Sequence, residues 1–321
     1  GAIDSLKKDM NSKLDIHSFL FHFNDLLISI SITFFNNIIA TILAVIIAFL
    51  ITNYLYNKKF FKSSFLIILI SFPHISYCIG ITYLFATSGF FARLFAFFYG
   101  NNIPFISERG DASSSLIYII GLALREVPFL VLIGLSVLKK INAMQIQKQV
   151  LVLGHSNLSA MLCCIFPIWL KSMTLPILII VTFCFSNYEF SSILGPQFPH
   201  MINVKIIDSW YSTNFNLARQ MNSLIIITIL SSILALITLY TLMQILNGYL
   251  KNQKFLGFGN YNLFLLGKIF YFIVIALFMI ILFITSLLSI SESWFFPTIM
   301  PSSFSLRGFD YMVSNYLWLF F

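Results

Sequence analysis

Charged residues are scarce in this 321-residue sequence. Lys, Arg, Asp and Glu together make up 9% of it, whereas apolar residues make up 59% and aromatic residues 17%. Soluble globular proteins contain about 25% charged residues, so this scarcity excludes an ordinary soluble domain. A chain of this composition is expected to lie in a lipid bilayer.

Several chemical motifs are also missing. No Gly-x-x-x-x-Gly-Lys-Ser/Thr loop and no His-Glu-x-x-His motif occurs, so neither nucleotide hydrolysis nor zinc proteolysis is expected. The four cysteines lack the paired spacings of a zinc site or a disulfide framework, and we expect them to be reduced packing residues. They are Cys78, Cys163, Cys164 and Cys184. The net charge of +8 comes from scattered basic residues, which does not favour nucleic-acid binding. We expect a non-catalytic chain without a metal or cofactor of its own.

Six apolar stretches have the length of about 20 residues that a helix needs to cross a bilayer. They lie at 29–55, 64–86, 115–138, 163–186, 218–246 and 264–288. Because these stretches are continuous, and not ten-residue segments of alternating polarity, helices are favoured over a β-barrel. The sequence predicts an all-α polytopic membrane protein with six transmembrane helices.

The basic residues indicate the orientation, since they gather in cytoplasmic loops. Ten of them flank the loops after the first, third and fifth spans: Lys58, Lys59, Lys62, Lys139, Lys140, Lys148, Lys171, Lys251, Lys254 and Lys268. This pattern places residues 139–162 inside the cell. Residues 1–28, 87–114, 187–217 and 289–321 are placed outside. The first 28 residues have neither the basic nor the apolar region of a signal peptide, so we expect a membrane helix upstream of Gly1.

Charges and prolines interrupt the spans. Arg125 and Glu126 lie in the middle of the third span, where an isolated charge costs about 3 kcal/mol. The pair is interpreted either as a polar element of a translocation path or as a structural tie at the kink that Pro128 introduces. In the second span Pro73 predicts another kink, and His74 beside it is a candidate substrate contact.

The fourth span and the outer loop after it contain further helix breakers. Pro176 predicts a kink within the span. Gly195, Pro196 and Pro199 predict a rigid, irregular turn at the membrane surface. This turn either contacts a substrate-delivery protein or closes the helix end.

The polar loop at 139–162 has a pattern of its own. Residues 140–153 are predicted to form a short helix at the membrane surface. Its apolar residues are expected to face the bundle: Ile141, Met144, Val150, Leu151 and Leu153. Gly154 permits a sharp turn, and a second short helix can start at Ser156 or Asn157. Such a helix-turn-helix either inserts into a groove of another protein or is an ordinary amphipathic loop helix.

This loop resembles the cytoplasmic signature of binding-protein-dependent ABC importer permeases. That signature reads Glu-Ala-Ala, three residues, Gly, nine residues, Ile, one residue, Leu-Pro. The matching positions here are Lys148, Gln149 and Val150, then Gly154, Cys164, Phe166 and Pro167. Gly154 and Pro167 match strictly, while Lys148 reverses the charge of the usual Glu. The resemblance implies that the loop, including His155, is the site where an ATPase docks.

Other segments are similar to permeases with two fused repeats, such as those of thiamine and iron(III) importers. They are Ser31 to Thr33, Phe72 to His74, Arg125 to Phe129 and Leu194 to Pro196. The resemblance implies a type I ABC importer permease core at 29–247 and a cytoplasmic linker at 248–263. Residues 264–321 would then contain the first transmembrane helix of a second repeat and an extracytoplasmic segment.

The resemblance also implies a setting and partners. The chain would be a non-catalytic subunit in a bacterial inner membrane, with two copies of an ATPase that bind ATP and Mg. A periplasmic solute-binding protein would deliver a thiamine-like solute or iron(III), and a second permease half would be fused or separate. One alternative is an ion-coupled secondary transporter or channel, although Arg125 beside Glu126 makes a poor proton relay. Another is a membrane scaffold without transport activity.

Overall fold

The computed structural model describes residues 2–57, 64–86, 88–100, 112–212, 215–252, 263–307 and 310. The elements are α1 (Ala2–Tyr56), α2 (Ser64–Ile70), α3 (His74–Phe85), α4 (Phe90–Tyr99), α5 (Ala112–Lys140), α6 (Ala143–Val152), α7 (Asn157–Ser159), the π-helix η1 (Ala160–Ile165), α8 (Phe166–Ser172), α9 (Thr174–Ser186), α10 (Tyr188–Ile193), α11 (Ile202–Tyr211), α12 (Phe215–Asn252), α13 (Leu263–Ile290), β1 (Ser291–Ser293) and β2 (Ser303–Phe304). The two short strands pair antiparallel. The predicted all-α class is therefore confirmed.

Long apolar helices dominate the described part of the chain. Five of them are long and apolar enough to cross a membrane: Asn24–Tyr56, His74–Tyr99, Ser115–Lys140, Met221–Leu250 and Leu263–Ile290. A sixth candidate is the pair Asn157–Ser172 and Thr174–Ser186, whose halves meet at an angle of 61°. The chain is a multi-pass membrane protein, and each predicted span overlaps one of these segments.

The second predicted span, 64–86, is broken near its middle. α2 ends at Ile70 and α3 begins at His74, with Pro73 between them at φ −59° and ψ 137°. Proline has no backbone N–H and disfavours helical angles in the residue before it, which explains why α2 stops here. The predicted kink at Pro73 is thus a complete break, and the candidate span starts at His74 and continues through α4.

The fourth predicted span is bent close to Pro176, as predicted. The bend lies at Met173, between α8 and α9. Pro176, in the first turn of α9, lacks the N–H that would continue the hydrogen bonding across this bend. Pro167 follows the π-helix η1 and removes a second donor there. Pro128 differs, because α5 runs past it as one continuous helix.

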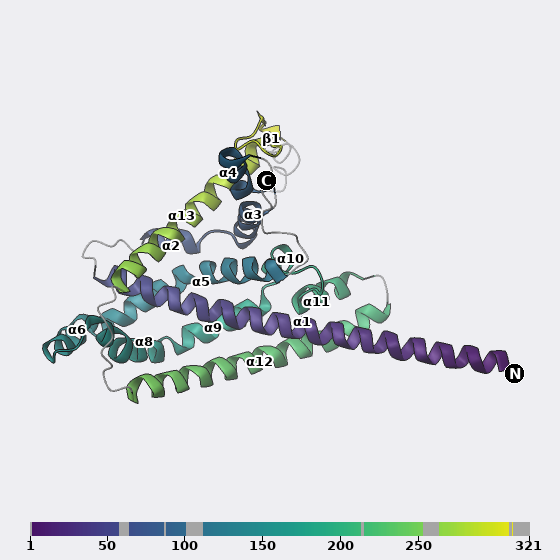
Figure 1. Ribbon diagram of the computed structural model, residues 1–321, viewed down its shortest axis with the longest axis horizontal. Coiled ribbons are helices and arrows are strands. Elements are labelled where there is room, and N and C mark those ends of the chain that lie inside the picture. The colour runs from purple at the N-terminus through teal and green to yellow at the C-terminus, as the bar shows by residue number, and fades with distance from the viewer. Residues whose placement is uncertain are drawn as a thin grey trace, which may run out of the picture.

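The helices α1, α5, α9 and α12 run side by side along the long axis of the molecule (Figure 1). α13 crosses them at a slant, and α3, α4 and β1 lie near its far end (Figure 1). α6 and the C-terminal end of α12 lie at one end of the bundle, which we name the α6 end. α10, α11 and the start of α1 lie at the other, the α11 end. α6 and the C-terminal end of α12 thus lie opposite α10, α11 and the start of α1, and the assignment of the α6 end to the cytoplasm stays a prediction.

Close packing holds the crossing helices together. Trp169 is fully buried within the main core, with its ring 5.1 Å from that of Phe49. Where α13 crosses α1, a Cβ added to Gly267 would lie 2.3 Å from the carbonyl oxygen of Leu50. Small residues at such crossings let helix backbones approach each other in membranes. By contrast, α12 and α13 leave much of their apolar surface exposed, for lipid or another protein to cover.

Candidate functional site

The loop with the permease-like signature protrudes beyond the α6 end (Figure 1). α5 ends at Lys140, and Asn142 then adopts a left-handed backbone (φ 51°) that redirects the chain into α6. Asparagine is one of the few residues that tolerate this region. The return leg begins at Ser156, whose hydroxyl accepts a hydrogen bond from the Ser159 N–H at 3.2 Å. The predicted helical cap at Ser156 is confirmed.

Gly154 forms the turn between the two legs. Its φ is +83°, a region that residues with a Cβ rarely adopt. The N–H of His155 bonds to the carbonyl of Val150 at 3.3 Å, and the N–H of Gly154 to that of Leu151 at 3.0 Å. These two bonds form a Schellman motif, which ends a helix with a glycine at the residue after its cap. The glycine of the signature therefore has a local structural reason, and the predicted sharp turn is confirmed.

The apolar residues of the loop do not all face the bundle. Val150 is buried and Ile141 is half-buried, but Met144, Leu151 and Leu153 are exposed. The expectation for these three residues was wrong. Only Ala143 and Val150, two helical turns apart on the same side of α6, are buried within that helix, so the rest of its surface projects away from the protein.

The exposed end of α6 therefore carries an apolar tip, which we define as Leu151, Val152 and Leu153. Val152 is 87% exposed and Leu153 is 70% exposed. The two legs are tied to each other by a hydrogen bond from the Gln147 amide to Asn157. A fixed protrusion with an apolar tip is a shape that can insert into a groove of another protein.

The remaining signature residues lie along the same loop. Lys148 and Gln149 are exposed on α6, His155 and Cys164 are half-buried, and Pro167 is buried at the start of α8. Their predicted role in docking an ATPase stays a prediction.

A polar cluster lies inside the bundle. Arg125 Nη1 is 3.6 Å from Glu126 Oε1, and Arg125 Nη2 is 2.6 Å from Nε2 of His74. His74 is the first residue of α3, and its ring packs 5.2 Å from that of Phe183 on α9. The structure thus brings together three residues that the sequence analysis had assigned to two separate helix breaks, and it joins α3, α5 and α9 through them.

Two atoms of this cluster have no hydrogen-bond partner among the described residues. They are Nδ1 of His74 and Oε1 of Glu126, and Glu126 is only 6% exposed. Since Arg125 Nη2 can only donate, Nε2 of His74 accepts the bond and Nδ1 carries the proton of the neutral ring. The cluster therefore offers one unused donor and one unused acceptor, which suits either a polar ligand or a buried water.

The predicted turn after α10 brings the backbone at Gly195 close to the end of α10. A Cβ on Gly195 would lie 2.3 Å from the carbonyl oxygen of Ser191. Pro196 is buried, Pro199 is half-buried, and Phe198 between them is 79% exposed. The turn therefore presents Phe198 at the α11 end of the bundle, and its contact with a binding protein stays a prediction.

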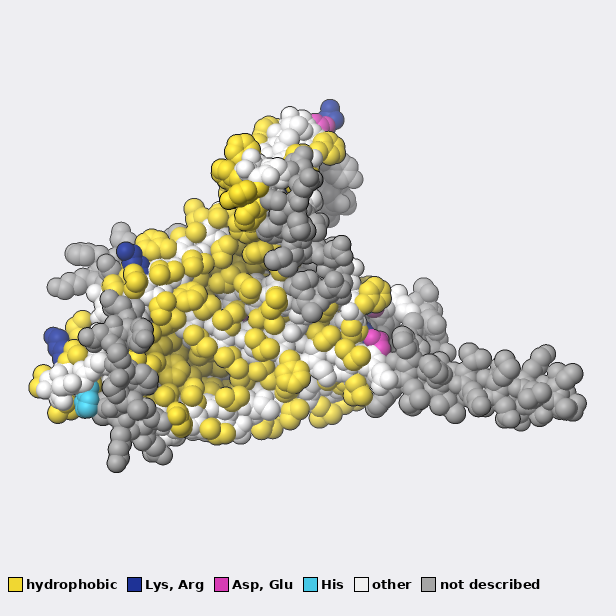
Figure 2. All heavy atoms as spheres, viewed as in Figure 1, with side chains coloured by type: hydrophobic (Ala, Val, Ile, Leu, Met, Phe, Trp, Pro, Cys, Tyr) yellow, Lys and Arg dark blue, Asp and Glu magenta, His cyan; other side chains and the backbone are white. Residues whose placement is uncertain are grey.

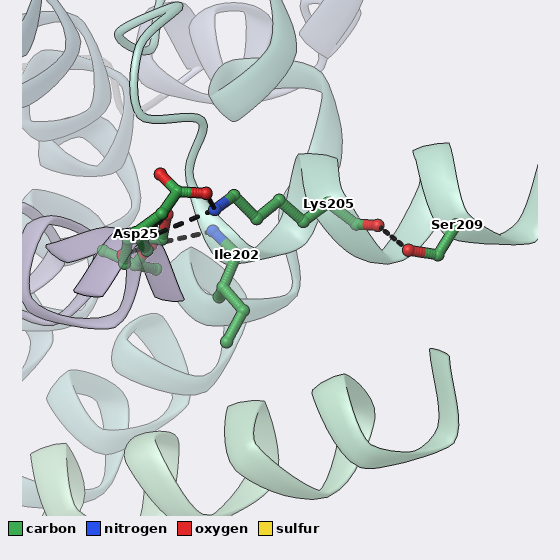
Figure 3. A network of polar contacts seen from close by, with 6 residues as sticks. Asp25, Ile202, Lys205 and Ser209 are labelled. Carbon is green, nitrogen blue, oxygen red and sulfur yellow. Dashed lines mark hydrogen bonds and ion pairs between the residues drawn. The ribbon is translucent and has the colours of Figure 1, made fainter. Parts of the chain in front are cut away.

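A second polar network ties this turn to α1 (Figure 3). Lys205 Nζ lies 2.5 Å from Oδ2 of Asp25, and the N–H of Ile202 donates to the Thr33 hydroxyl at 3.1 Å. Lys205 also accepts a bond on its carbonyl from Ser209 at 2.7 Å. The network fixes α11 against the start of the first candidate span.

The sequence analysis missed this network, although a signal was present. Polar residues recur every four positions along α1, at Asp25, Ser29, Thr33, Asn37 and Thr41. Residues four apart share one face of a helix. Polar side chains within a membrane span usually face the bundle interior, so the stripe predicts a buried polar seam. Asn37, in that seam, accepts a 2.7 Å hydrogen bond from the hydroxyl of Tyr118 on α5.

Among the described residues, no three His, Cys, Asp or Glu side chains group closely enough to hold a metal ion. Comparisons of the chain with protein-family models, with curated proteins and with solved structures found no match.

Proposed function

We propose that this chain is the membrane-spanning permease subunit of a bacterial ABC importer. An ATPase on the cytoplasmic side would hydrolyse ATP and press on the loop between α5 and α8. A solute-binding protein on the other side would deliver the solute, with a thiamine-like compound or iron(III) as the first candidates. The chain itself would alternate access and catalyse nothing.

The observation that carries this proposal is the α6 protrusion. It protrudes beyond the end of a membrane bundle, and it exposes most of the surface of Val152 and Leu153. Its glycine and proline also have the spacing of the permease signature. An exposed apolar tip on a polar loop indicates a surface that a partner protein covers. A loop fixed at both ends to membrane helices is a suitable shape for transmitting a rigid-body motion.

The test is capture of an ATPase from membranes of the native host. The tagged full-length chain, its Val152→Asp variant and its Phe198→Asp variant are purified under identical mild conditions, and ATP-binding ABC subunits are identified by mass spectrometry. Both substitutions place a carboxylate on a highly exposed apolar residue, so neither should affect folding. Only Val152→Asp should lose the ATPase. Absence of any ATPase from the unmodified chain, or its retention by Val152→Asp, would refute the proposal.

The polar cluster favours a second candidate function, an ion-coupled secondary transporter. His74 adds a second titratable side chain to Glu126, beside the fixed charge of Arg125, and ion-coupled transporters place such groups on their pathways. Uptake into cells depleted of ATP but holding a proton gradient separates the two candidates. Uptake that persists supports the secondary transporter, whereas uptake that stops supports the ABC permease.

A further inference from the structure

Arg93 is a buried cation that joins two segments far apart in the sequence. It belongs to α4, is 3% exposed and has its guanidinium directed at the chain that follows α13. It donates to the backbone carbonyls of Ser88, Trp294, Phe295 and Thr298, at 2.8, 3.3, 3.0 and 2.7 Å. Its guanidinium carbon also lies 5.1 Å from the ring centre of Trp294 and 5.7 Å from that of Tyr83. These contacts hold α4 and residues 291–307 together as one unit, which we name the Arg93 lobe.

The surface of the lobe is aromatic. Its exposed large side chains include Phe95, Phe97, Phe98, Tyr99, Phe295 and Phe296. Arg93 is the only charged residue of α4, and it points inward. The other charges of the lobe are Glu292 and Arg307, which form an exposed ion pair at 3.1 Å. A helix exposing this many aromatic rings and no charge is poorly suited to water.

The position of the lobe indicates what covers it. The lobe follows the end of α13, a candidate membrane span, and lies beside the bundle at the level of α10 (Figure 1). Hydrophobic side chains gather on the flank of the lobe that faces the α6 end, and they continue onto the exposed apolar surface of the bundle (Figure 2). A dark blue and a magenta side chain lie at its far tip (Figure 2). This arrangement matches the boundary of a bilayer, with apolar side chains toward the hydrocarbon and charges toward water.

We propose that the Arg93 lobe lies in the interfacial layer of the bilayer at the α11 end of the bundle, with its aromatic flank in contact with lipid. Aromatic side chains are enriched at this depth of a membrane, and short helices with an apolar face lie in the plane of the interface. Arg93 acts as the positioning residue, because its carbonyl contacts fix which side of α4 faces the lipid. The lobe thereby anchors the far end of α13.

Quenching of tryptophan fluorescence tests the depth of the Arg93 lobe in the bilayer, with the full-length chain reconstituted in liposomes. Trp210, Trp294 and Trp318 are replaced by Phe, while the buried Trp169 stays as a constant background. One reporter is then added as Phe98→Trp in the lobe or as Phe198→Trp on the exposed turn. Lipid brominated near its ester groups should quench the first reporter strongly and the second weakly, and aqueous iodide should give the opposite order. The reporter Ile233→Trp, on the exposed side of α12, calibrates full lipid contact.

A second readout keeps all native tryptophans. A charged maleimide should label Phe198→Cys and leave Phe98→Cys unlabelled beyond the level of the unmodified chain. The proposal is overturned if iodide quenches and maleimide labels position 98 as readily as position 198. The lobe would then lie in water, and a protein partner would be the better occupant. No ATPase is present in either measurement, so the outcome does not depend on the proposed importer function.

Discussion

Replacing Gly154 by Ala perturbs the proposed docking loop in a single, well-defined way. Nothing lies within 4 Å of the position that a Cβ would take, so the substitution creates no clash. The φ of +83° remains unfavourable for alanine, and a residue with a Cβ in the left-handed region costs about 1–2 kcal/mol. The whole cost is therefore conformational, and it falls on the Schellman motif that ends α6.

This cost sets the size of the expected effect. A free-energy change of 1–2 kcal/mol corresponds to a factor of about 5–30 in an equilibrium constant. If the ATPase binds the capped form of the loop, its apparent affinity falls by at most this factor, because it falls with the population of that form. We therefore expect Gly154→Ala to bind the ATPase more weakly, by a factor of up to about 5–30.

Gly100 supplies a matched control. It has a φ of +88° and, like Gly154, open space around its Cβ position, but it ends α4 in the Arg93 lobe. Gly100→Ala should carry a backbone cost at least as large, because its ψ of 173° places it in a region that is essentially restricted to glycine, while leaving the ATPase affinity unchanged. Binding is measured by titrating a labelled ATPase against each variant in nanodiscs, and thermal unfolding is followed alongside.

Two outcomes would refute the reasoning. If Gly100→Ala weakens binding as much as Gly154→Ala, the effect is a general loss of stability and does not concern docking. If Gly154→Ala binds normally although its thermal unfolding shows the backbone cost, the loop is not the docking surface.

Two further predictions concern stability. Gly267→Leu should lower the unfolding temperature strongly, because its Cβ would meet the Leu50 carbonyl at 2.3 Å. In the control Gly248→Leu the added Cβ meets nothing within 4 Å, so the unfolding temperature should stay unchanged. Equal effects of the two substitutions would contradict the observed crossing of α13 over α1. Arg125→Met should cost about 3–5 kcal/mol by leaving the carboxylate of Glu126 buried without a counter-charge, and adding Glu126→Gln should restore part of it. Thermal unfolding in detergent measures both effects, and a double variant no more stable than Arg125→Met would exclude this electrostatic cause.

Local rules predicted the backbone of the loop well. The turn at Gly154, the cap at Ser156 and the breaks near Pro73 and Pro176 each follow from conformational preferences of one or two residues. These preferences act over a few residues and are readable in the sequence. The positions of the apolar stretches were readable for a related reason, since lipid requires each span to satisfy its own backbone.

Tertiary contacts account for what the sequence did not reveal. The exposure of Leu151 and Leu153 depends on which side of α6 touches its neighbours, and an amphipathic pattern alone does not determine that. The contact between His74 and Arg125 joins residues 51 positions apart on two helices. The pair of Lys205 with Asp25 spans 180 positions. Such contacts require the packing of the bundle to be known first.

The polar cluster of His74, Arg125 and Glu126 is connected to the docking loop through both of the helices that hold the loop. On one side, α5 runs without a break from Lys140 back to Arg125, about 22 Å at 1.5 Å per residue. On the other side, η1, α8 and the bend at Met173 lead into α9, where Phe183 packs on His74. Under the proposed function, a push on the loop is carried rigidly by the continuous helix. The second attachment contains a π-helix and a bend of 61°, which can absorb part of the movement. The two sides of the cluster would then shift relative to each other, and His74 would lose or change its contact with Arg125. Under the proposed importer function, the cluster is therefore the point at which movement of the loop reaches the interior of the bundle. This role does not require Glu126 to change its protonation state.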